Sequence, residues 1–410
     1  MNIIKSDYIL TIDDEFRIIK NGAVAYEKKI IEISSSFQEL KQKYPQAEIT
    51  ECEKDSVLMP GFVNAHIHLE FSKNRTTLEY GDFLPWLYSV IEKREELIDG
   101  CSSECYEETI EEMLEFGITS FGAISSYGFD MNSCAKAKQK VVFFNEVIGS
   151  NPAAIDGFFT DFKARVNSSE ELKSETFFPA VAIHSAYSVH PVLVRHVLKI
   201  ARENRYRVST HFMESKAERE WLDRSQGEFK QFFKDFLKIE KASSDPISFL
   251  GLFESLEPIF VHAVYANEEE LAIIEKQKAH IVHCPVSNRL LGSRPLNLEN
   301  IKSKEIPFLI ATDGLSSNFS TNMFKEMRAA LMQQSCLDLH LLSRDLLIAA
   351  TKNSANALGL NCGSIEEGKD ADFAVFKLPN SVENEKNLPL QLILHSNRAD
   401  SVYILGEKIF

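Results

Sequence analysis

The sequence has little that would direct it to a membrane or to nucleic acid. No run approaches about 18 consecutive apolar residues, the length that favours a transmembrane helix, and the first residues lack the apolar stretch of a signal peptide. Its 45 lysines and arginines are outnumbered by 60 aspartates and glutamates, for a net charge of -15. Because nucleic acids and anionic membranes attract basic surfaces, we expect neither as a main partner.

Cysteines are also few. The chain has seven, an odd number without paired spacing, and this usage is more typical of a reducing cytoplasm than of a disulfide framework. We therefore expect a cytoplasmic protein. At 410 residues, the chain suits one large barrel or two to three domains.

Several catalytic motifs are missing. No H-E-x-x-H occurs, which excludes the common zinc metalloprotease motif. His68-Leu69-Glu70 matches the H-x-E of the cytidine-type zinc deaminases, but those enzymes also need P-C-x-x-C, and Cys284-Pro285 has the reverse order. No glycine-rich phosphate loop follows the first long strand, which weighs against a doubly wound open sheet.

The most informative feature that is present is the pair His66 and His68 within PGFVNAHIHLE. Side chains alternate across a β-strand, so residues two apart project from the same face. Histidine is the commonest protein ligand for a borderline divalent ion. The spacing fits half of a metal site, and equally a pair of polar strand-end residues.

A repeating rhythm of strands and helices follows this pair. Expected helices include Val192–Glu203, Glu268–Lys278 and Thr321–Gln333. With the strand that ends at His66, the expected strands number eight, which is the number that closes a parallel (β/α)₈ TIM-type barrel of the α/β class. The other seven are Ile118–Ile124, Val141–Ile148, Phe178–Ile183, Arg207–Thr210, Pro258–His262, Ala279–Cys284 and Pro307–Thr312.

Both ends of the chain break this rhythm. The N-terminal part contains the expected strands Tyr8–Ile12, Gly22–Tyr26 and Lys29–Ile33. The C-terminal part, in Gly363–Phe376 and Ser401–Phe410, contains expected strands with tight turns at Gly368-Lys369 and Gly406-Glu407. Neither end has enough apolar residues for its own core. We expect residues 1–55 and 363–410 to form one small composite β-sandwich beside a barrel of residues 56–362.

Polar and charged residues gather where the expected barrel strands end. They include His184 after the fourth strand, His211 and Glu214 after the fifth, His262 after the sixth and Asp313 after the eighth. Functional residues of such barrels lie at the carboxyl ends of the strands. A single strand-end histidine is more often structural, but five on one rim, with an aspartate, favour a metal site.

Five segments, in order, resemble the amidohydrolase superfamily: PGFVNAHIHLE, HFMES, FVHAVY, HCPVSNRLLGS and ATDGLSSN. The segments ATKNSANALGL and GSIEEGKDADFAVF are similar to the end of its cytosine deaminase and chlorohydrolase branch. The resemblance covers essentially the whole chain. It implies a distorted (β/α)₈ barrel with a β-sandwich built from both termini.

The resemblance also implies roles for individual residues. The metal ligands fall on His66, His68, His211 and Asp313, the general acid/base on Glu214, the histidine beside the reacting water on His262, and a substrate-facing histidine on His184. No lysine ends the fourth strand to supply a bridging carbamate, so one divalent ion is expected. Three His and one Asp suit Zn²⁺, with Fe²⁺ as the alternative. His283 and Cys284 are expected in the pocket wall.

The chemistry of these residue types agrees with a hydrolytic deaminase. A divalent ion lowers the pKa of a bound water from about 15.7 toward about 7. Asp313 can accept the proton of that water, and Glu214 can carry a proton to a ring nitrogen of an aminopurine. This chemistry agrees with the catalytic roles that the resemblance implies for Glu214, His262 and Asp313.

Within the branch, the chain most resembles the aminodeoxyfutalosine deaminases of menaquinone biosynthesis, whose substrate is an adenine nucleoside that bears a benzoate. Methylthioadenosine/S-adenosylhomocysteine deaminases share nearly every motif, and guanine deaminases and triazine hydrolases are further alternatives. A catalytically silent metal-binding scaffold is the alternative from another class. The expected partner is a small nucleoside, and a homodimer is the expected assembly.

The segment that begins with Gly81-Asp82-Phe83 resembles the substrate-covering segment of purine nucleoside deaminases. This resemblance implies that Trp86 contacts the ligand, and the alternative is that Trp86 packs in the core. Glu95 or Glu92 is a candidate for a ribose hydroxyl pair. Arg94, or Arg289 after the seventh strand, is a candidate for a carboxylate substituent.

Overall fold

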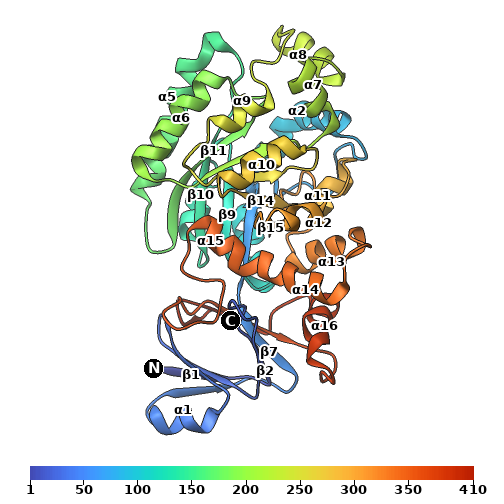
Figure 1. Ribbon diagram of the computed structural model, residues 1–410. Coiled ribbons are helices and arrows are strands. Elements are labelled where there is room, and N and C mark those ends of the chain that lie inside the picture. The colour runs from blue at the N-terminus through green and yellow to red at the C-terminus, as the bar shows by residue number, and fades with distance from the viewer.

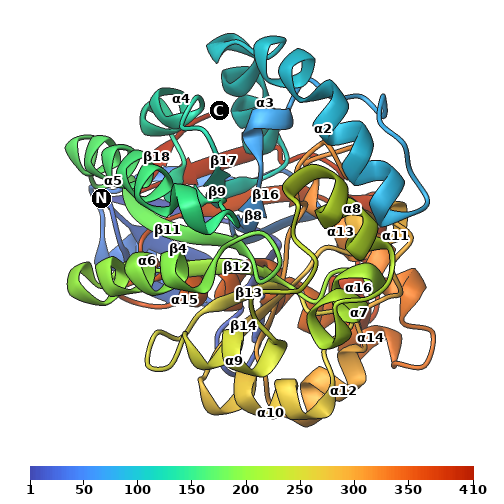
Figure 2. The same cartoon turned by 90° about the horizontal axis from the view of Figure 1, so that it is seen from above.

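The computed structural model describes the backbone of residues 1–410 and the side chains of residues 1–97 and 100–410. At its centre, eight parallel strands follow one another in chain order. This arrangement, surrounded by helices (Figures 1 and 2), confirms the predicted barrel. The strands are β8 (Phe62–Ile67), β9 (Ile118–Ser125), β10 (Lys140–Val147), β11 (Phe177–Ser185), β12 (Val208–Phe212), β13 (Ile259–His262), β14 (His280–His283) and β15 (Phe308–Ile310).

Hydrogen bonds close the seam between the first and last barrel strands. The side-chain amide of Asn64 in β8 donates to Thr312 Oγ1 at 2.7 Å, and its Oδ1 accepts from the Thr312 amide at 3.1 Å. The Asp313 amide donates to the carbonyl of His66 at 3.1 Å. The seam thereby brings Asp313 beside the first predicted metal ligand, His66, although the two are 247 positions apart in the chain.

Helix α6 (Pro191–Asn204) illustrates how the outer layer forms. Pro191 occupies the first turn, where its missing N–H costs nothing, and His190 Nδ1 accepts from the Val192 amide. The chain leaves the helix at Arg205 with φ 58°. The expected helices are present as α6, α10 (Glu268–Lys276) and α13 (Met323–Gln333). The others that follow β8 are α2 (Phe83–Asp99), α3 (Ser103–Glu115), α4 (Met131–Lys136), α5 (Ile155–Glu171), α7 (Lys216–Arg224), α8 (Glu228–Leu237), α9 (Pro246–Gly251), α11 (Pro285–Leu290), α12 (Leu298–Ser303), α14 (Leu339–Ile348), α15 (Ser354–Leu358) and α16 (Leu388–His395).

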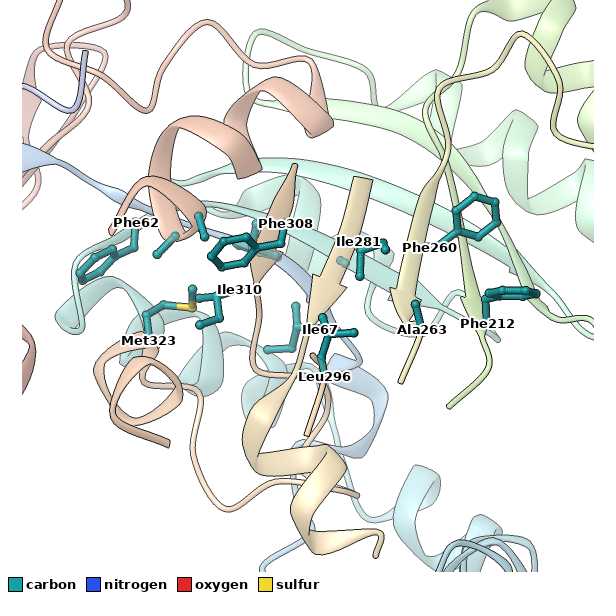
Figure 3. Close-up of a cluster of buried hydrophobic side chains, with 14 of the residues drawn as sticks. Phe62, Ile67, Phe212, Phe260, Ala263, Ile281, Leu296, Phe308, Ile310 and Met323 are labelled. Atoms are coloured by element: carbon teal, nitrogen blue, oxygen red, sulfur yellow. The ribbon is translucent and has the colours of Figure 1, made fainter. Parts of the chain in front are cut away.

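Successive side chains of the barrel strands point to opposite faces and therefore belong to two different apolar clusters. Val261, Val282 and Leu309 belong to a cluster with members from seven of the eight barrel strands, which places it in the barrel interior. Their neighbours Phe260 and Ile310 pack instead with the helices, as Figure 3 shows. Two buried faces explain why these strands read as continuous apolar runs.

The two chain ends meet beside the barrel (Figure 1). In a six-stranded sheet, β7 (Ser56–Pro60) pairs with N-terminal β2 (Tyr8–Leu10) and C-terminal β16 (Phe373–Lys377). Outside them lie β3 (Ile18–Lys20), β17 (Ser401–Ile404) and β18 (Glu407–Lys408). A four-stranded sheet contains β1 (Asn2–Lys5), β4 (Ala23–Tyr26), β5 (Ile30–Ser34) and β6 (Glu48–Glu51), with helix α1 (Phe37–Lys43). The domain boundaries at 55 and 363 stay a prediction.

The prediction for Gly363–Phe376 is partly wrong. The predicted turn at Gly368-Lys369 is present, with φ 84° at Gly368, and strand β16 follows it, but the residues before the turn form no strand, and Gly363 has φ 88°. The preceding segment instead bonds to the N-terminal strands, where the Ile365 amide donates to the Thr11 carbonyl at 2.7 Å. Helices α1 and α16, inside the end segments, were not predicted.

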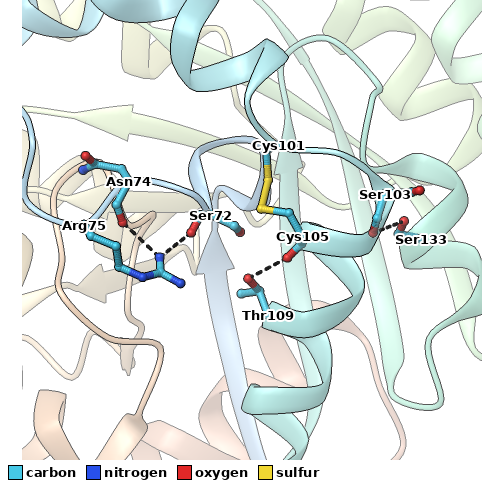
Figure 4. The surroundings of a disulfide bond; sticks show 8 residues. All are labelled: Ser72, Asn74, Arg75, Cys101, Ser103, Cys105, Thr109 and Ser133. Carbon is cyan, nitrogen blue, oxygen red and sulfur yellow. Dashed lines mark hydrogen bonds between the residues drawn. A yellow bond between two sulfur atoms is a disulfide. The ribbon is translucent and has the colours of Figure 1, made fainter.

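One pair of cysteines corrects the expected cysteine chemistry. Cys101 and Cys105 form a disulfide between the residues before α3 and its first turn (Figure 4). Four-residue spacing at a helix start brings their Cα atoms to 5.4 Å, within reach of such a bond. Five other cysteines are free. In the described part of the chain, every helix is too short or too polar to cross a membrane.

Candidate active site

Six titratable side chains meet at the carboxyl ends of the barrel strands. The strand ends share one rim, so residues distant in sequence converge there. Each of the six residues is at most 9% exposed. They are His66 and His68 at the end of β8, His211 in β12, Glu214 just beyond it, His262 at the end of β13 and Asp313 after β15.

The four predicted metal ligands face one another. Nε2 of His66 and Nε2 of His68 lie 3.6 and 3.8 Å from Asp313 Oδ1. Nε2 of His68 and Nε2 of His211 are 3.3 Å apart. The three histidines offer nitrogen atoms that all lie within 4.8 Å of one another.

This donor set fits a divalent metal ion. Both ring nitrogens of His66 are buried without a hydrogen-bond partner, and an unpaired buried polar atom is costly unless a ligand satisfies it. Burial lowers the pKa of His68 to about 4 and that of His211 well below its usual range. Neutral imidazoles are the form that binds metal, and three nitrogens with one carboxylate oxygen suit Zn²⁺ or Fe²⁺.

Asp313 is held as a carboxylate. Ser287 Oγ and Ser317 Oγ donate to its Oδ2 at 2.8 and 3.0 Å, and the Gly314 amide donates to Oδ1 at 2.7 Å. Burial would raise the pKa of Asp313, but the hydrogen bond and charge of His66, together with the charges of His262 and His68, hold that pKa well below its usual range. A side chain on Gly314 would come within 2.9 Å of His68 Cβ, so glycine permits this close approach.

Contacts at Nδ1 orient the ring of His211. Its Nδ1 lies 2.7 Å from the His184 carbonyl, and a donated hydrogen bond there leaves Nε2 free for a metal. Glu146 at the end of β10 places Oε1 3.9 Å from the same Nδ1. That carboxylate is buried, and this oxygen has no hydrogen-bond partner.

The backbone is strained where these side chains attach. Met213, His262, Ala263 and Asp313 have φ values of 51°, 72°, 50° and 60°, a region that residues other than glycine seldom occupy. Backbone hydrogen bonds hold the turns, such as that from the Ala263 amide to the Phe212 carbonyl at 2.8 Å. Such strain clusters at functional sites.

Glu214 and His262 form a second pair beside the ligands. His262 Nε2 lies 3.4 Å from Glu214 Oε1 and 3.9 Å from Asp313 Oδ2. Its Nδ1 lies 2.9 Å from Asn288 Oδ1, a contact that assigns the proton to Nδ1. Burial lowers the pKa of His262 to about 4, so its Nε2 is an acceptor at neutral pH.

Glu214 suits proton transfer. Burial, then the charges of Asp313 and Glu218, raise the pKa of Glu214 well above its usual range. The Glu214 amide donates to Glu218 Oε2 at 2.8 Å, and Ser293 Oγ donates to the Glu214 carbonyl at 2.7 Å. A carboxyl that retains a proton toward neutral pH, on a fixed backbone, can act as acid and then as base.

The predicted substrate residues are spread more widely. The ring of His184 lies 5.1 Å from that of His211, and its Nδ1 is 2.6 Å from Ser188 Oγ. Trp86 in α2 donates from Nε1 to the Ser316 carbonyl at 2.8 Å, and packs against the apolar cluster. Arg94 and Glu95 are exposed on α2, and Arg289 is exposed on α11.

Several residues of the site were not predicted from the sequence. Glu146 carried a signal, because it is a carboxylate in the otherwise apolar run Val141–Val147. Ser287, Asn288 and Ser317 carried none, since serine and asparagine are ordinary loop residues. Cys284 was expected in the pocket wall, and it lies within 4.8 Å of ligand atoms of His262 and Asp313; burial raises the pKa of its thiol well above the usual range.

An eight-stranded barrel with three histidines and an aspartate at its rim defines a metal-dependent hydrolase. The amidohydrolase family matches residues 57–409, and the chain belongs to this family. The predicted resemblance, fold and enzyme class are thereby confirmed. The family is metal-dependent, and the required His/His/His/Asp group is present.

Individual relatives match over the full length. The chain is 49% identical to an aminodeoxyfutalosine deaminase of Nitratiruptor, over 100% of this chain and 99% of the relative. It is 32% identical to an adenosine deaminase of Helicobacter pylori, over 99% of each. The crystal structure of Helicobacter pylori aminofutalosine deaminase in complex with methylthio-coformycin has a TM-score of 0.95 and 31% identity, over 100% of both chains.

Proposed function

We propose that this protein is a metal-dependent deaminase that converts aminodeoxyfutalosine to futalosine and ammonia, in menaquinone biosynthesis. The observation that carries this proposal is the full-length match, at 49% identity, to an aminodeoxyfutalosine deaminase. The pair Glu214 and His262 beside the four ligands supports the same reaction class. It also weighs against a silent scaffold, which needs no proton-transfer group.

His66, His68, His211 and Asp313 would hold one divalent ion, Zn²⁺ in preference to Fe²⁺. Bound there, the ion would lower the pKa of a coordinated water toward about 7, so that water can attack at neutral pH. The unpartnered nitrogens of His66 support the placement.

The protein's own residues then move protons. Asp313 accepts a proton from the attacking water, and the low pKa of its carboxyl keeps it ready as a base. Glu214 delivers a proton to N1 of the purine, which makes C6 electrophilic. His262 accepts a hydrogen bond at Nε2 and thereby orients the water. The proton that Asp313 accepted then passes to the 6-amino group, the C6–N bond breaks to release ammonia, and the hydroxyl proton at C6 returns to Glu214. Proton transfers of this kind typically contribute about 10² to 10⁴ in rate.

We propose that His184 and Trp86 contact the substrate, because both lie near the rim. Glu95, or Glu92, remains the proposed partner of the ribose hydroxyls. Arg94 or Arg289 remains the proposed partner of the benzoate. A cytoplasmic location and a homodimer complete the proposal.

A side-by-side deamination assay tests this function. The metal-loaded enzyme is given aminodeoxyfutalosine, methylthioadenosine, S-adenosylhomocysteine, adenosine and guanine, and the adenine absorbance band is followed for the adenine nucleosides. We expect the highest kcat/KM on aminodeoxyfutalosine. Comparable values on all nucleosides would refute that substrate. A preference for methylthioadenosine would favour the second candidate, since a relative with that activity in its name is 27% identical. Stoichiometric metal without turnover of any of them would refute the deaminase itself.

A further inference from the structure

The loop after β9 presents two aromatic rings on the rim that carries the metal ligands. The rings of Tyr127 and Phe129 are stacked, with centroids 5.8 Å apart and planes at 19°. Phe129 is 58% exposed, although its neighbour Met131 is buried. Because the loop follows the carboxyl end of β9, the exposed ring lies on the functional end of the barrel.

A positive charge from another element accompanies the rings. The guanidinium carbon of Arg94 in α2 lies 5.9 Å from the centroid of the Tyr127 ring. A guanidinium over an aromatic face is attracted by the ring, and it keeps N–H donors free for a carboxylate. Among the described side chains, Arg289 has no such aromatic contact, which distinguishes the two candidate arginines.

The loop is fixed relative to the ligands. The Glu70 carboxylate, two residues after His68, accepts hydrogen bonds from the amides of Ser126 and Tyr127 at 2.8 and 3.0 Å. Ser126 Oγ donates to Glu146 Oε2 at 2.5 Å, and the other oxygen of Glu146 lies 3.9 Å from His211 Nδ1. These bonds hold the loop beside the ligand group, whereas among the described side chains neither ring stacks on a ligand histidine, so we assign the rings to the distal part of a nucleoside rather than to its reacting ring.

We propose that Arg94, Tyr127 and Phe129, here called the aromatic platform, bind an aromatic carboxylate at the distal end of the substrate. The aromatic ring of the substrate stacks on Phe129, and its carboxylate pairs with Arg94. This inference rests on the proposed function, because the benzoate of aminodeoxyfutalosine is the group that would occupy the platform. It also chooses Arg94 over Arg289 as the carboxylate partner.

The test compares three substrates on the metal-loaded enzyme: aminodeoxyfutalosine, the methyl ester of its benzoate, and methylthioadenosine. A charge-assisted hydrogen bond contributes about 1.5–3 kcal/mol, so we expect Arg94→Gln to lower kcat/KM on aminodeoxyfutalosine by about 10- to 100-fold, mainly through KM. Its rates on the ester and on methylthioadenosine should stay within about twofold, and Arg94→Lys should recover part of the loss.

Phe129→Ala should lower kcat/KM on the acid and the ester alike by about 2- to 10-fold, as expected for a lost ring stack, and should spare methylthioadenosine. Arg195→Gln, at an exposed arginine of α6, is the matched control and should change none of the three. Melting temperatures of all variants show whether each is folded.

The platform is refuted if Arg94→Gln resembles Arg195→Gln, or if it lowers all three rates equally. Failure of the proposed function gives a different result, in which the wild-type enzyme itself prefers methylthioadenosine. In both cases, the ratio of kcat/KM on the acid to kcat/KM on the ester is measured for the wild type and for Arg94→Gln. A ratio that is lower in the variant shows that the platform binds the carboxylate, and an unchanged ratio shows that it does not.

Discussion

The two ends of the barrel differ in whether their buried polar groups have partners within the chain. At the base, Lys140 opens β10 with its side chain 2% exposed, and Nζ lies 2.7 Å from one carboxylate oxygen each of Asp370 and Asp372. Burial by itself would lower the pKa of Lys140, but the charge of Asp372 and the hydrogen bonds to Asp370 and Asp372 together raise it, so the ammonium keeps its charge. At the rim, both ring nitrogens of His66 and Nε2 of His262 have no partner.

This difference separates stability from function. Asp370 and Asp372 precede β16, so the paired cluster at the base joins the barrel to the sheet formed by the chain ends. Its polar groups are satisfied within the chain. At the rim, the ring nitrogens of His66 and Nε2 of His262 have no partner within the chain, and a bound group would satisfy them, which marks the rim as the functional end.

The largest effect is expected at the rim, from Glu214→Gln. The amide keeps the size of the side chain but cannot donate and accept the transferred proton. We predict that kcat falls by about 10² to 10⁴, whereas metal content, measured by elemental analysis, stays at the wild-type value. Activity within tenfold of wild type would show that another group moves the proton.

At the base, Lys140→Met should damage stability and spare chemistry. Removal of the lysine leaves the buried carboxylate of Asp372 and the half-buried one of Asp370 uncompensated, and breaking a buried ion pair in this way typically costs about 3–5 kcal/mol. Denaturant unfolding measures this loss, and kcat per folded molecule should be unchanged. Lys138→Met is the control, because Lys138 is 55% exposed and 3.9 Å from Glu111, and should cost about 0–1 kcal/mol. Equal stability of the two variants would contradict the assigned role of the base.

A smaller effect is expected from a paired carboxylate behind the rim. Glu326 in α13 accepts hydrogen bonds from Asn318 Nδ2 at 2.7 Å and from the Val286 amide at 3.2 Å. Burial raises the pKa of Glu326 to about 8. The stability that its protonated form contributes is fully present below pH about 4.5 and is lost as the pH rises through about 8.

Glu326→Gln removes this titration. The free energy of unfolding of the wild type should therefore fall relative to that of the variant between pH 5 and pH 9, as measured by urea unfolding at each pH. Parallel curves for the two proteins would show that Glu326 does not titrate as its burial indicates.

The residues of the rim could be predicted from the sequence because short sequence patterns place them at strand ends. His66 and His68 share a face through period-two spacing, and His211, His262 and Asp313 follow apolar runs that end on the same rim. The base was not predictable, since Lys140 and Asp370 are 230 residues apart and a lysine at a strand start is usually solvated.

Other failures have separate physical causes. In Gly363–Phe376 the predicted turn at Gly368-Lys369 is present, but the residues before it form no strand, because the Ile365 amide bonds instead to the Thr11 carbonyl in the N-terminal part. The Cys101–Cys105 pair depended on where α3 begins, which composition does not define. A role for Tyr127 and Phe129 could not be predicted from the sequence, because it depends on the contact between Tyr127 and Arg94 of α2, which only the fold creates.

Metal titration tests the central claim most directly, namely that the rim atoms are unpaired because they hold one ion that the reaction requires. The enzyme is stripped with a chelator, Zn²⁺ is added in known amounts, and deamination of aminodeoxyfutalosine is measured at each step. We predict that stripped enzyme is inactive and that one equivalent of Zn²⁺ per chain restores full activity. Full activity without metal, or activity that needs two equivalents, would contradict the account.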